Sequence, residues 1–114
     1  RDSRALRYAR IDATLEAGRT EEAASLARDA IGRQRADPRL WERLARAEER
    51  LGHRTAYHRA QAEVYALRGS LPAAIHQLDL ARRADDGDFY ELSAVDARLR
   101  ELKVEDRLRS EERR

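Results

Sequence analysis

The chain has 114 residues, 41% of them hydrophobic and 40% charged, which is the size of one domain and the composition of a folded, helix-rich protein rather than a disordered one. Its 24 basic and 22 acidic residues nearly cancel and alternate along the chain, so we expect no nucleic-acid partner. There is no cysteine for a disulfide or a thiolate zinc site, and no apolar run approaches the roughly 20 residues of a membrane-spanning helix, so we also expect no transmembrane segment.

Apolar residues recur at helical spacing in every segment, without the two-residue alternation of β-strands. The fold is therefore predicted to be all-α. In chain order we predict six helices, over Arg4–Ala17, Glu21–Arg35, Pro38–Leu51, Thr55–Arg68, Leu71–Ala84 and Asp88–Ser110. Only short connections separate them, so consecutive helices are expected to fold back on one another as antiparallel hairpins.

Turn and cap residues mark the breaks between the predicted helices. Glycine adopts the left-handed conformation that ends a helix without strain, and we expect it to do so at Gly18, Gly52, Gly69 and Gly87. Polar side chains that accept from the free N–H groups of the next helix are expected at Thr20, Asp37, Thr55, Ser70 and Asp88. Asp88 and Glu91 have the spacing of a capping box.

The glycines also reveal a repeat. Gly18 and Gly52 are 34 residues apart, which is the period of the tetratricopeptide repeat. A shift of 51 residues places Gly18 on Gly69, in the turns before the second and fifth predicted helices, and Ala23 and Ala30 on Ala74 and Ala81 within them. Small side chains let neighbouring helices approach closely. The sequence thus predicts a tetratricopeptide-like α-solenoid with repeats at about 4–35, 38–68 and 55–84, followed by a capping helix at 88–110.

The pattern departs from the repeat in three places. Arg7 and Arg10 stand where Trp and Leu are expected, three extra residues precede Asp37, and Tyr57 replaces an expected Ala. The helix at 55–68 belongs both to the second and to the third repeat. Which of its faces lines a groove therefore stays open.

The last predicted helix carries one apolar stripe, formed by Leu92, Val95, Leu99 and Leu102. Such a stripe must be covered, either by capping the end of the stack or by forming the seam of a homodimer. Beyond Lys103 the sequence is too charged to bury much surface, and we expect it to fray.

No catalytic or metal-binding motif is found. The histidines His53, His58 and His76 lack the HExxH spacing of a helical zinc pair and have no obvious third ligand. Thr20 and Ser70 are better explained as helix caps than as nucleophiles. We therefore expect no enzymatic activity and no cofactor in this chain.

The segment from Gly52 to Leu102 resembles, as a whole, the C-terminal end of periplasmic zinc metalloproteases of the β-barrel assembly-enhancing (BepA-type) family. The residues that carry the likeness are His58-Arg59-Ala60, Ala62-Glu63, Tyr65, Gly69, Ala74-Ile75, Gln77-Leu78, Ala81, Phe89-Tyr90 and Asp96-Ala97-Arg98-Leu99. Residues before Gly52 share the likeness only at the level of the repeat.

The resemblance implies that this chain is the repeat domain of such a protease, with the zinc-containing HExxH domain on its N-terminal side. It further implies a periplasmic location and a role in the quality control of outer-membrane β-barrel proteins. The repeat domain is then expected to recruit the substrate or the assembly machinery. A start at Arg1 rather than Met agrees with an excised piece of a longer chain.

A solenoid of hairpins binds a peptide on the concave face formed by the first helix of each repeat. On that face we predict Tyr8, Asp12, Leu15, Arg39, Glu42, Arg46 and Glu49. Arg59 and Glu63 join them if the helix at 55–68 turns the face expected from its sequence towards the groove. The arginines offer guanidinium forks to carboxylates or carbonyls, and Tyr8 offers a rigid aromatic contact. For each residue the simpler interpretation is a solvated charged surface with i,i+4 pairs. Trp41, Tyr57 and Tyr65 are assigned to packing.

Two other functions remain open from the residues alone. The chain is either a free-standing repeat adaptor for a different assembly, or a helical structural protein that dimerises through the stripe of its last helix.

Overall fold

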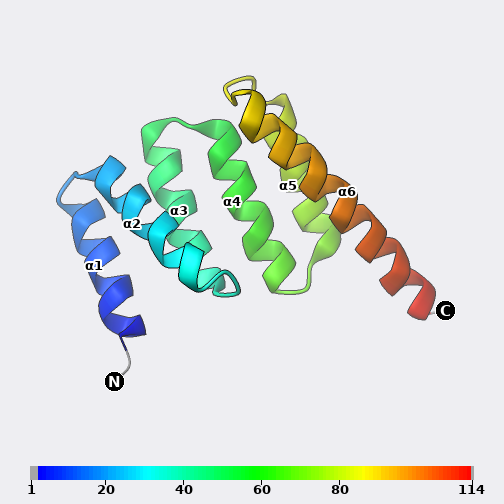
Figure 1. Cartoon of the computed structure of the whole chain (residues 1–114), viewed down its shortest axis with the longest axis horizontal. Helices are drawn as coiled ribbons and strands as arrows, with labels where there is room; N and C mark the ends of the chain where they lie inside the picture. The colour runs from blue at the N-terminus through cyan, green and yellow to red at the C-terminus, as the bar shows by residue number, and fades with distance from the viewer. Residues whose placement is uncertain (1–2, 114) are drawn as a thin grey trace.

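The computed structural model describes residues 3–113, which form six α-helices and no β-strand (Figure 1). The helices are α1 (Arg4–Glu16), α2 (Thr20–Arg33), α3 (Pro38–Leu51), α4 (Arg54–Leu67), α5 (Leu71–Arg83) and α6 (Phe89–Glu112). Each boundary lies within two residues of the predicted one, and the all-α prediction is confirmed. No helix in the described part of the chain is long and apolar enough to cross a membrane.

Three of the four expected glycine turns are confirmed, since Gly18, Gly52 and Gly69 have φ values of +83°, +78° and +85°. The expectation for Gly87 is wrong. Between α5 and α6 the left-handed position is taken by Asp85, with φ +73°. Aspartate tolerates this conformation better than most residues, because its short polar side chain can bond locally.

Two of the expected helix caps are confirmed. Asp37 accepts from the N–H of Arg39 at 3.0 Å, and Asp88 accepts from the N–H of Glu91 at 2.8 Å. Ser70 precedes α5, but its side chain makes no capping hydrogen bond.

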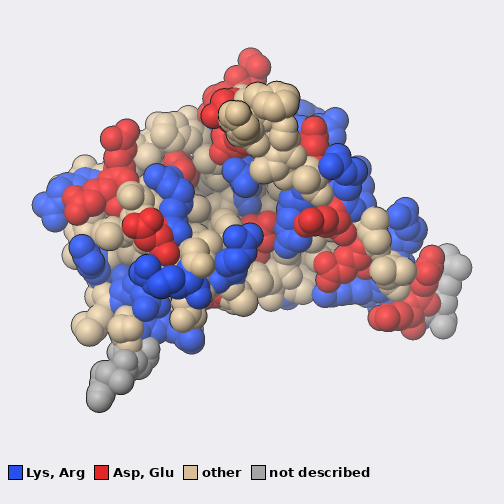
Figure 2. All heavy atoms as spheres, viewed as in Figure 1, with Lys and Arg blue, Asp and Glu red and all other residues tan. Residues whose placement is uncertain are grey.

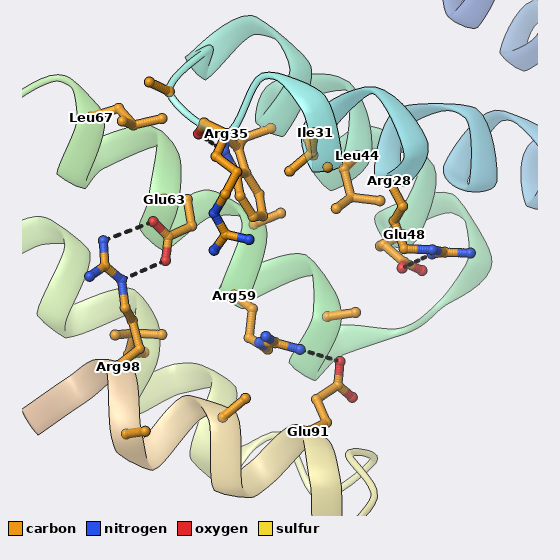
Figure 3. Close-up of a pocket in the computed structure, with 18 of the residues that line it drawn as sticks. Arg28, Ile31, Arg35, Leu44, Glu48, Arg59, Glu63, Leu67, Glu91 and Arg98 are labelled. Atoms are coloured by element: carbon orange, nitrogen blue, oxygen red, sulfur yellow. Dashed lines mark hydrogen bonds and ion pairs between the residues drawn. The ribbon is translucent and has the colours of Figure 1, made fainter. Parts of the chain in front are cut away.

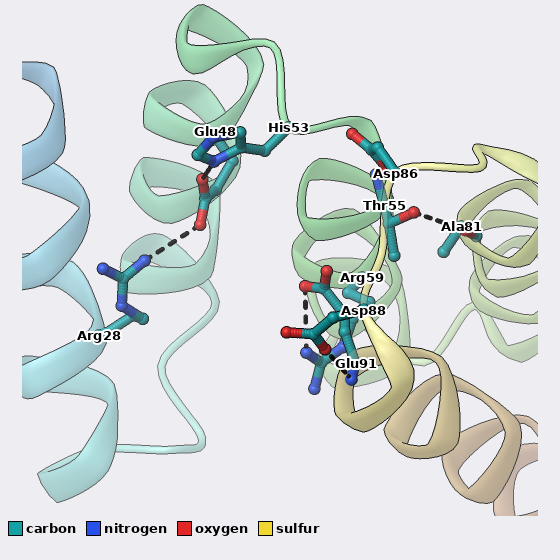
Figure 4. A network of polar contacts seen from close by, with 9 residues as sticks. All are labelled: Arg28, Glu48, His53, Thr55, Arg59, Ala81, Asp86, Asp88 and Glu91. Atoms are coloured by element: carbon teal, nitrogen blue, oxygen red, sulfur yellow. Dashed lines mark hydrogen bonds and ion pairs between the residues drawn. The ribbon is translucent and has the colours of Figure 1, made fainter.

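The expectation that Thr20 and Thr55 cap helices is wrong, since both lie inside their helices. The Thr55 hydroxyl is buried and donates to the carbonyl of Ala81 at 2.9 Å. Asp86, in the turn before α6, caps α4 instead by accepting from the N–H groups of Arg54 and Thr55 at 2.7 and 2.9 Å (Figure 4).

Consecutive helices pack on one another along the whole chain, as expected for a solenoid-like stack. Two further contacts join helices that are next but one: α1 packs on α3, and α4 packs on α6. Within residues 3–113, α3 does not pack on α5, and α2 does not pack on α4. The helix α4 therefore packs on the next two helices, α5 and α6, as α1 packs on α2 and α3, so a new three-helix unit begins at α4. The stack is two helices deep, with Cα extents of 48 × 37 × 18 Å.

Small side chains fill the places where helices nest. Ala23, Ala30, Ala74 and Ala81, which were predicted to allow close packing, are all buried. The core divides into two clusters, one around Ile11 and Leu40 in α1–α4 and the other around Leu78, Val95 and Leu102 in α4–α6.

The stripe of α6 is covered within the chain itself. Val95, Leu99 and Leu102 are buried against α5, and Leu92 is half-buried. The capping function is thus confirmed, and the stripe is not free to form a dimer seam. The expected fraying beyond Lys103 is not seen, since α6 continues to Glu112, helped by an i,i+4 pair of Arg109 with Glu105 at 2.7 Å.

Candidate functional site

An open trough with a cavity volume of about 870 Å³ runs along one face of the stack. In Figure 1, α2 and α6 lie nearest the viewer, with α3 and α4 behind them. These four helices supply most of the side chains that line the trough. The trough lies where α2 and α4 fail to pack on each other. Its lining includes Arg28, Ile31, Arg35, Trp41, Leu44, Glu48, Ala56, Arg59, Ala60, Glu63, Leu67, Glu91, Ala94, Ala97, Arg98 and Glu101.

The floor of the trough is apolar. Ile31, Leu44 and Ala60 are buried members of the N-terminal core, and Trp41 packs against the same cluster while one side faces the cavity. The indole N–H of Trp41 donates to the backbone carbonyl of Arg35 at 2.9 Å. This bond fixes the turn between α2 and α3, which is the rim of the trough.

Ion pairs stiffen the walls (Figure 3). Arg98 of α6 holds Glu63 of α4 through two hydrogen bonds of 2.8 and 3.0 Å. The hydrogen bond to Glu63 raises the pKa of Arg98 above its ordinary value. Nearer the start of α6, Arg59 contacts Glu91 at 3.5 Å. These contacts tie α4 to α6 and hold one wall in place.

The other wall carries a buried carboxylate. Glu48 of α3 is reached by Arg28 of α2 at 3.0 Å and by Nδ1 of His53 at 2.7 Å (Figure 4). A buried carboxylate needs such partners, because an unpaired charge in this position is strongly destabilising. No side-chain polar atom buried in the described structure lacks a hydrogen bond.

Arg35 differs from the other charged residues of the trough. Its side chain is exposed and extends into the cavity from the turn after α2 (Figure 3). Within residues 3–113 its guanidinium group has no hydrogen-bond or ion-pair partner. Positive and negative side chains otherwise intermingle over this face of the molecule (Figure 2).

Two of the residues predicted for a groove, Arg59 and Glu63, line the trough. The face of α4 beside α6 is therefore the one that borders this cavity. The other predicted residues, Tyr8, Asp12, Arg39, Glu42, Arg46 and Glu49, do not line it.

On α3 the predicted and observed faces are nearly opposite. Arg39 is two residues from Trp41, and Arg46 is two residues from Glu48, a separation of roughly 160° around a helix. Arg46 lies 3.8 Å from Asp12 of α1. Glu42 pairs with Arg68 of α4 at 2.7 Å. The exposed side chains of Arg39 and Glu49 have no partner among the described residues.

The predicted residues of α1 serve its packing on α3. Asp12 accepts two hydrogen bonds from Arg43, each of 3.0 Å, and the same guanidinium lies 4.4 Å from the centre of the Tyr8 ring. Burial, together with a hydrogen bond to Asp37, raises the pKa of Tyr8 above its ordinary value of 10.0. Leu15, also expected to face a groove, is a buried core residue instead.

Some of the histidines and aromatic residues make contacts within the fold, and others are exposed. Nδ1 of His58 lies 2.8 Å from the side-chain oxygen of Gln77, and His76 is exposed. No group of three His, Asp or Glu side chains within residues 3–113 is arranged to hold a metal ion. Tyr57 packs on the N-terminal core as predicted, whereas Tyr65 keeps 37% of its surface exposed.

Sequence reasoning missed Arg28, Arg35, Glu48, Glu91 and Arg98 as parts of one site. The trough joins α2 to α6, which are far apart in sequence and are not neighbours in a regular repeat. One signal was present, namely the three extra residues before Asp37, because Arg35 lies at that departure from the repeat.

The fold and the trough define the chain as a solenoid-like helical stack with an open trough on one face. Comparison with known proteins adds no family to this description: no protein-family model matches the chain, and no curated protein matches it.

Proposed function

We propose that the chain is a non-catalytic scaffold that binds a segment of another protein in the trough. The observation that carries this proposal is a cavity of about 870 Å³ with an apolar floor and walls fixed by ion pairs. A surface that is already rigid before binding loses little conformational freedom when a partner arrives. Solenoid-like stacks bind extended or helical segments in this way.

A peptide-display experiment tests this function and does not require the identity of the partner. A random library of 16-residue peptides is selected on the folded chain, and the enriched peptides are measured against the variant Ala97→Arg. Ala97 is a half-buried residue of the α6 wall, so a long charged side chain there fills part of the trough. We expect affinity to fall about tenfold or more.

The matched control is the surface first predicted from the sequence. The variant with Arg39→Glu and Arg46→Glu changes the far side of α3 and is expected to bind the enriched peptides as the natural chain does. Binding that is lost in this control and kept in Ala97→Arg would move the site to the α1–α3 face. A library that yields no specific peptide would contradict the scaffold function itself.

We also propose that this scaffold belongs to a periplasmic zinc metalloprotease that acts on outer-membrane β-barrel proteins. The support is the resemblance of residues 52–102 to the C-terminal end of that family. The zinc and the HExxH motif are assigned to a catalytic domain upstream of Arg1. Sequencing the reading frame upstream provides the test, because a frame without HExxH would leave the free-standing adaptor as the better explanation.

A further inference from the structure

One arginine of the trough has no carboxylate partner, although the basic and acidic residues of the lining are equal in number, because Arg98 pairs with both Glu63 and Glu101. The lining contains four arginines, Arg28, Arg35, Arg59 and Arg98, and four glutamates, Glu48, Glu63, Glu91 and Glu101. Each glutamate lies within 3.5 Å of an arginine nitrogen of the same trough. Arg28, Arg59 and Arg98 are consumed in these pairs, whereas Arg35 has no partner within residues 3–113.

We propose that the trough is selective for an amphipathic α-helix that places a carboxylate against Arg35. The proposal rests on the binding function proposed above and specifies the chemistry of the partner. The apolar side of the helix lies on Ile31, Trp41 and Leu44, and an Asp or Glu side chain next to that side meets the guanidinium group.

A helix fits this surface better than an extended strand. Six of the lining residues have no side chain or only a methyl group: Gly32, Ala36, Ala56, Ala60, Ala94 and Ala97. Small residues allow a second helix to approach within the usual interaxial distance of about 8–10 Å. The described part of the chain has no β-strand and hence no sheet edge on which an extended peptide could form a ladder.

The preference for an acidic partner follows from a difference in pairing: the glutamates of the trough have arginine partners, whereas Arg35 has none within residues 3–113. A basic residue of the partner finds Glu48, Glu63 and Glu91 already held by arginines. Only Glu101, which is exposed and shares Arg98 with Glu63, is open to it, and the same partner residue is repelled by the unpaired Arg35. A carboxylate finds five N–H donors of Arg35 in a planar fork that matches its geometry. A wholly apolar partner would remove water from Arg35 without replacing the lost hydrogen bonds, which is unfavourable.

Arg35 is also placed for recognition by its own backbone. Its carbonyl is held by the indole N–H of Trp41, the residue on which the apolar side of the partner lies. The turn between α2 and α3 therefore fixes the spacing between the charged contact and the apolar contact. Because the backbone of Arg35 is already held in place, the arginine loses less conformational freedom when a partner binds.

The same peptide library tests the chemistry. Peptides selected on the natural chain are expected to be enriched in Asp or Glu at one position beside their apolar residues. For the best peptide, the natural chain should bind the Glu form about five- to tenfold more tightly than the Gln form, as a charge-assisted hydrogen bond at a partly exposed site allows.

Three variants sharpen the result. With Arg35→Gln the preference for Glu over Gln should disappear, and with Arg35→Glu the Lys form of the peptide should bind best. Arg33→Glu is the matched control, because Arg33 is exposed two residues earlier and does not line the trough. It should keep the preference of the natural chain. Equal melting temperatures would show that the exposed substitutions leave the fold intact.

The outcomes separate the two proposals. Peptides that need an open trough, as shown by Ala97→Arg, but bind equally well as Glu and Gln forms would overturn the acidic selectivity and leave the scaffold function standing. Selected peptides that Ala97→Arg does not weaken would overturn both. An enriched Lys or Arg on the natural chain would contradict the assignment of Arg35.

Discussion

In the N-terminal half of the chain, α1 is joined to α3 by Arg43, which holds Asp12 through two hydrogen bonds of 3.0 Å. In the C-terminal half, α4 is joined to α6 by Arg98, which holds Glu63 through two hydrogen bonds of 2.8 and 3.0 Å. Both halves thus use a bidentate arginine–carboxylate pair between helices that are next but one. The halves differ in the parity of the paired helices: the first half joins the odd-numbered α1 and α3, and the second half joins the even-numbered α4 and α6.

The change of parity explains where the trough comes from. A regular stack would continue from α1 and α3 to α5, but α3 does not pack on α5 in the described structure. The alternation restarts at α4, so α2 has no next-but-one neighbour on its own side. The space beside α2 stays open, and α6 becomes its far wall. A break in the repeat, rather than the repeat itself, forms the trough.

The largest expected effect comes from truncating each half's own core. Leu40 in the first cluster and Leu102 in the second are both buried, and replacing either by Ala should lower the free energy of unfolding by about 3 kcal/mol. Because a solenoid is held by contacts between neighbours, amide exchange should rise mainly in α1–α3 for Leu40→Ala and in α5–α6 for Leu102→Ala.

Exposed Leu108 provides the control for this pair, since Leu108→Ala should change stability by less than about 0.5 kcal/mol. Uniform loss of amide protection in both core variants would show that the two halves unfold as one unit. The comparison between halves would then describe geometry only and not energetics.

A smaller effect is expected at Asp86, which caps a helix of the C-terminal half from a distant turn. It caps α4 from the turn before α6, and α2 begins without any side-chain cap. Asp86→Asn keeps the shape but removes the charge, and should destabilise the chain by about 0.5–1 kcal/mol at pH 7, because the site is open to solvent. Asp85→Asn, at the neighbouring exposed residue, is the matched control and should be neutral.

The effect of Asp86 should depend on pH. Interaction with the Thr55 side chain, followed by the hydrogen bonds from the N–H groups of Thr55 and Arg54, lowers the pKa of Asp86 below its ordinary 3.8. The carboxylate therefore stabilises the fold above about pH 3.8, and this contribution is lost as the pH falls through the lower pKa of the folded state. Urea unfolding at pH 7 and below pH 3 should show the natural chain and Asp86→Asn converging in acid. A constant gap would exclude the charge as the cause.

The individual helices could be predicted from the sequence because each carries its own signals. Periodic apolar residues, Asp37 before Pro38 and the glycines at 18, 52 and 69 act locally, and the structure confirms them. The buried alanines were predictable because their spacing repeats along the chain. The stripe of α6 was predictable as a cap because an apolar stripe next to a stack has an obvious partner.

The site was harder to predict because it depends on which distant helices meet. The periodicity of apolar residues predicts which faces of α4 are buried, but it does not show that one of them packs on α6 instead of α2. Thr55 looks like a cap in sequence, yet Asp86, 31 residues away, does the capping. Arg39 and Arg46 are predicted on a groove by analogy with regular repeats, and they lie outside the trough, which forms where the parity of the stack changes.

The smallest expected effect concerns the turn between α5 and α6, where Asp85 takes the left-handed position that glycine takes in three other turns. Asp85 has φ +73°, whereas Gly18, Gly52 and Gly69 take the same region with no side chain. A left-handed conformation costs an ordinary L-residue about 1 kcal/mol, and Asp somewhat less. Glycine regains this energy but has more freedom to lose on folding. Asp85→Gly should therefore raise the free energy of unfolding by only about 0.3–0.5 kcal/mol, whereas Asp85→Ala should lower it by a similar amount. Urea titrations of the three proteins measure the difference, and a glycine variant less stable than the natural chain would show that the Asp85 side chain makes a contribution beyond its backbone conformation.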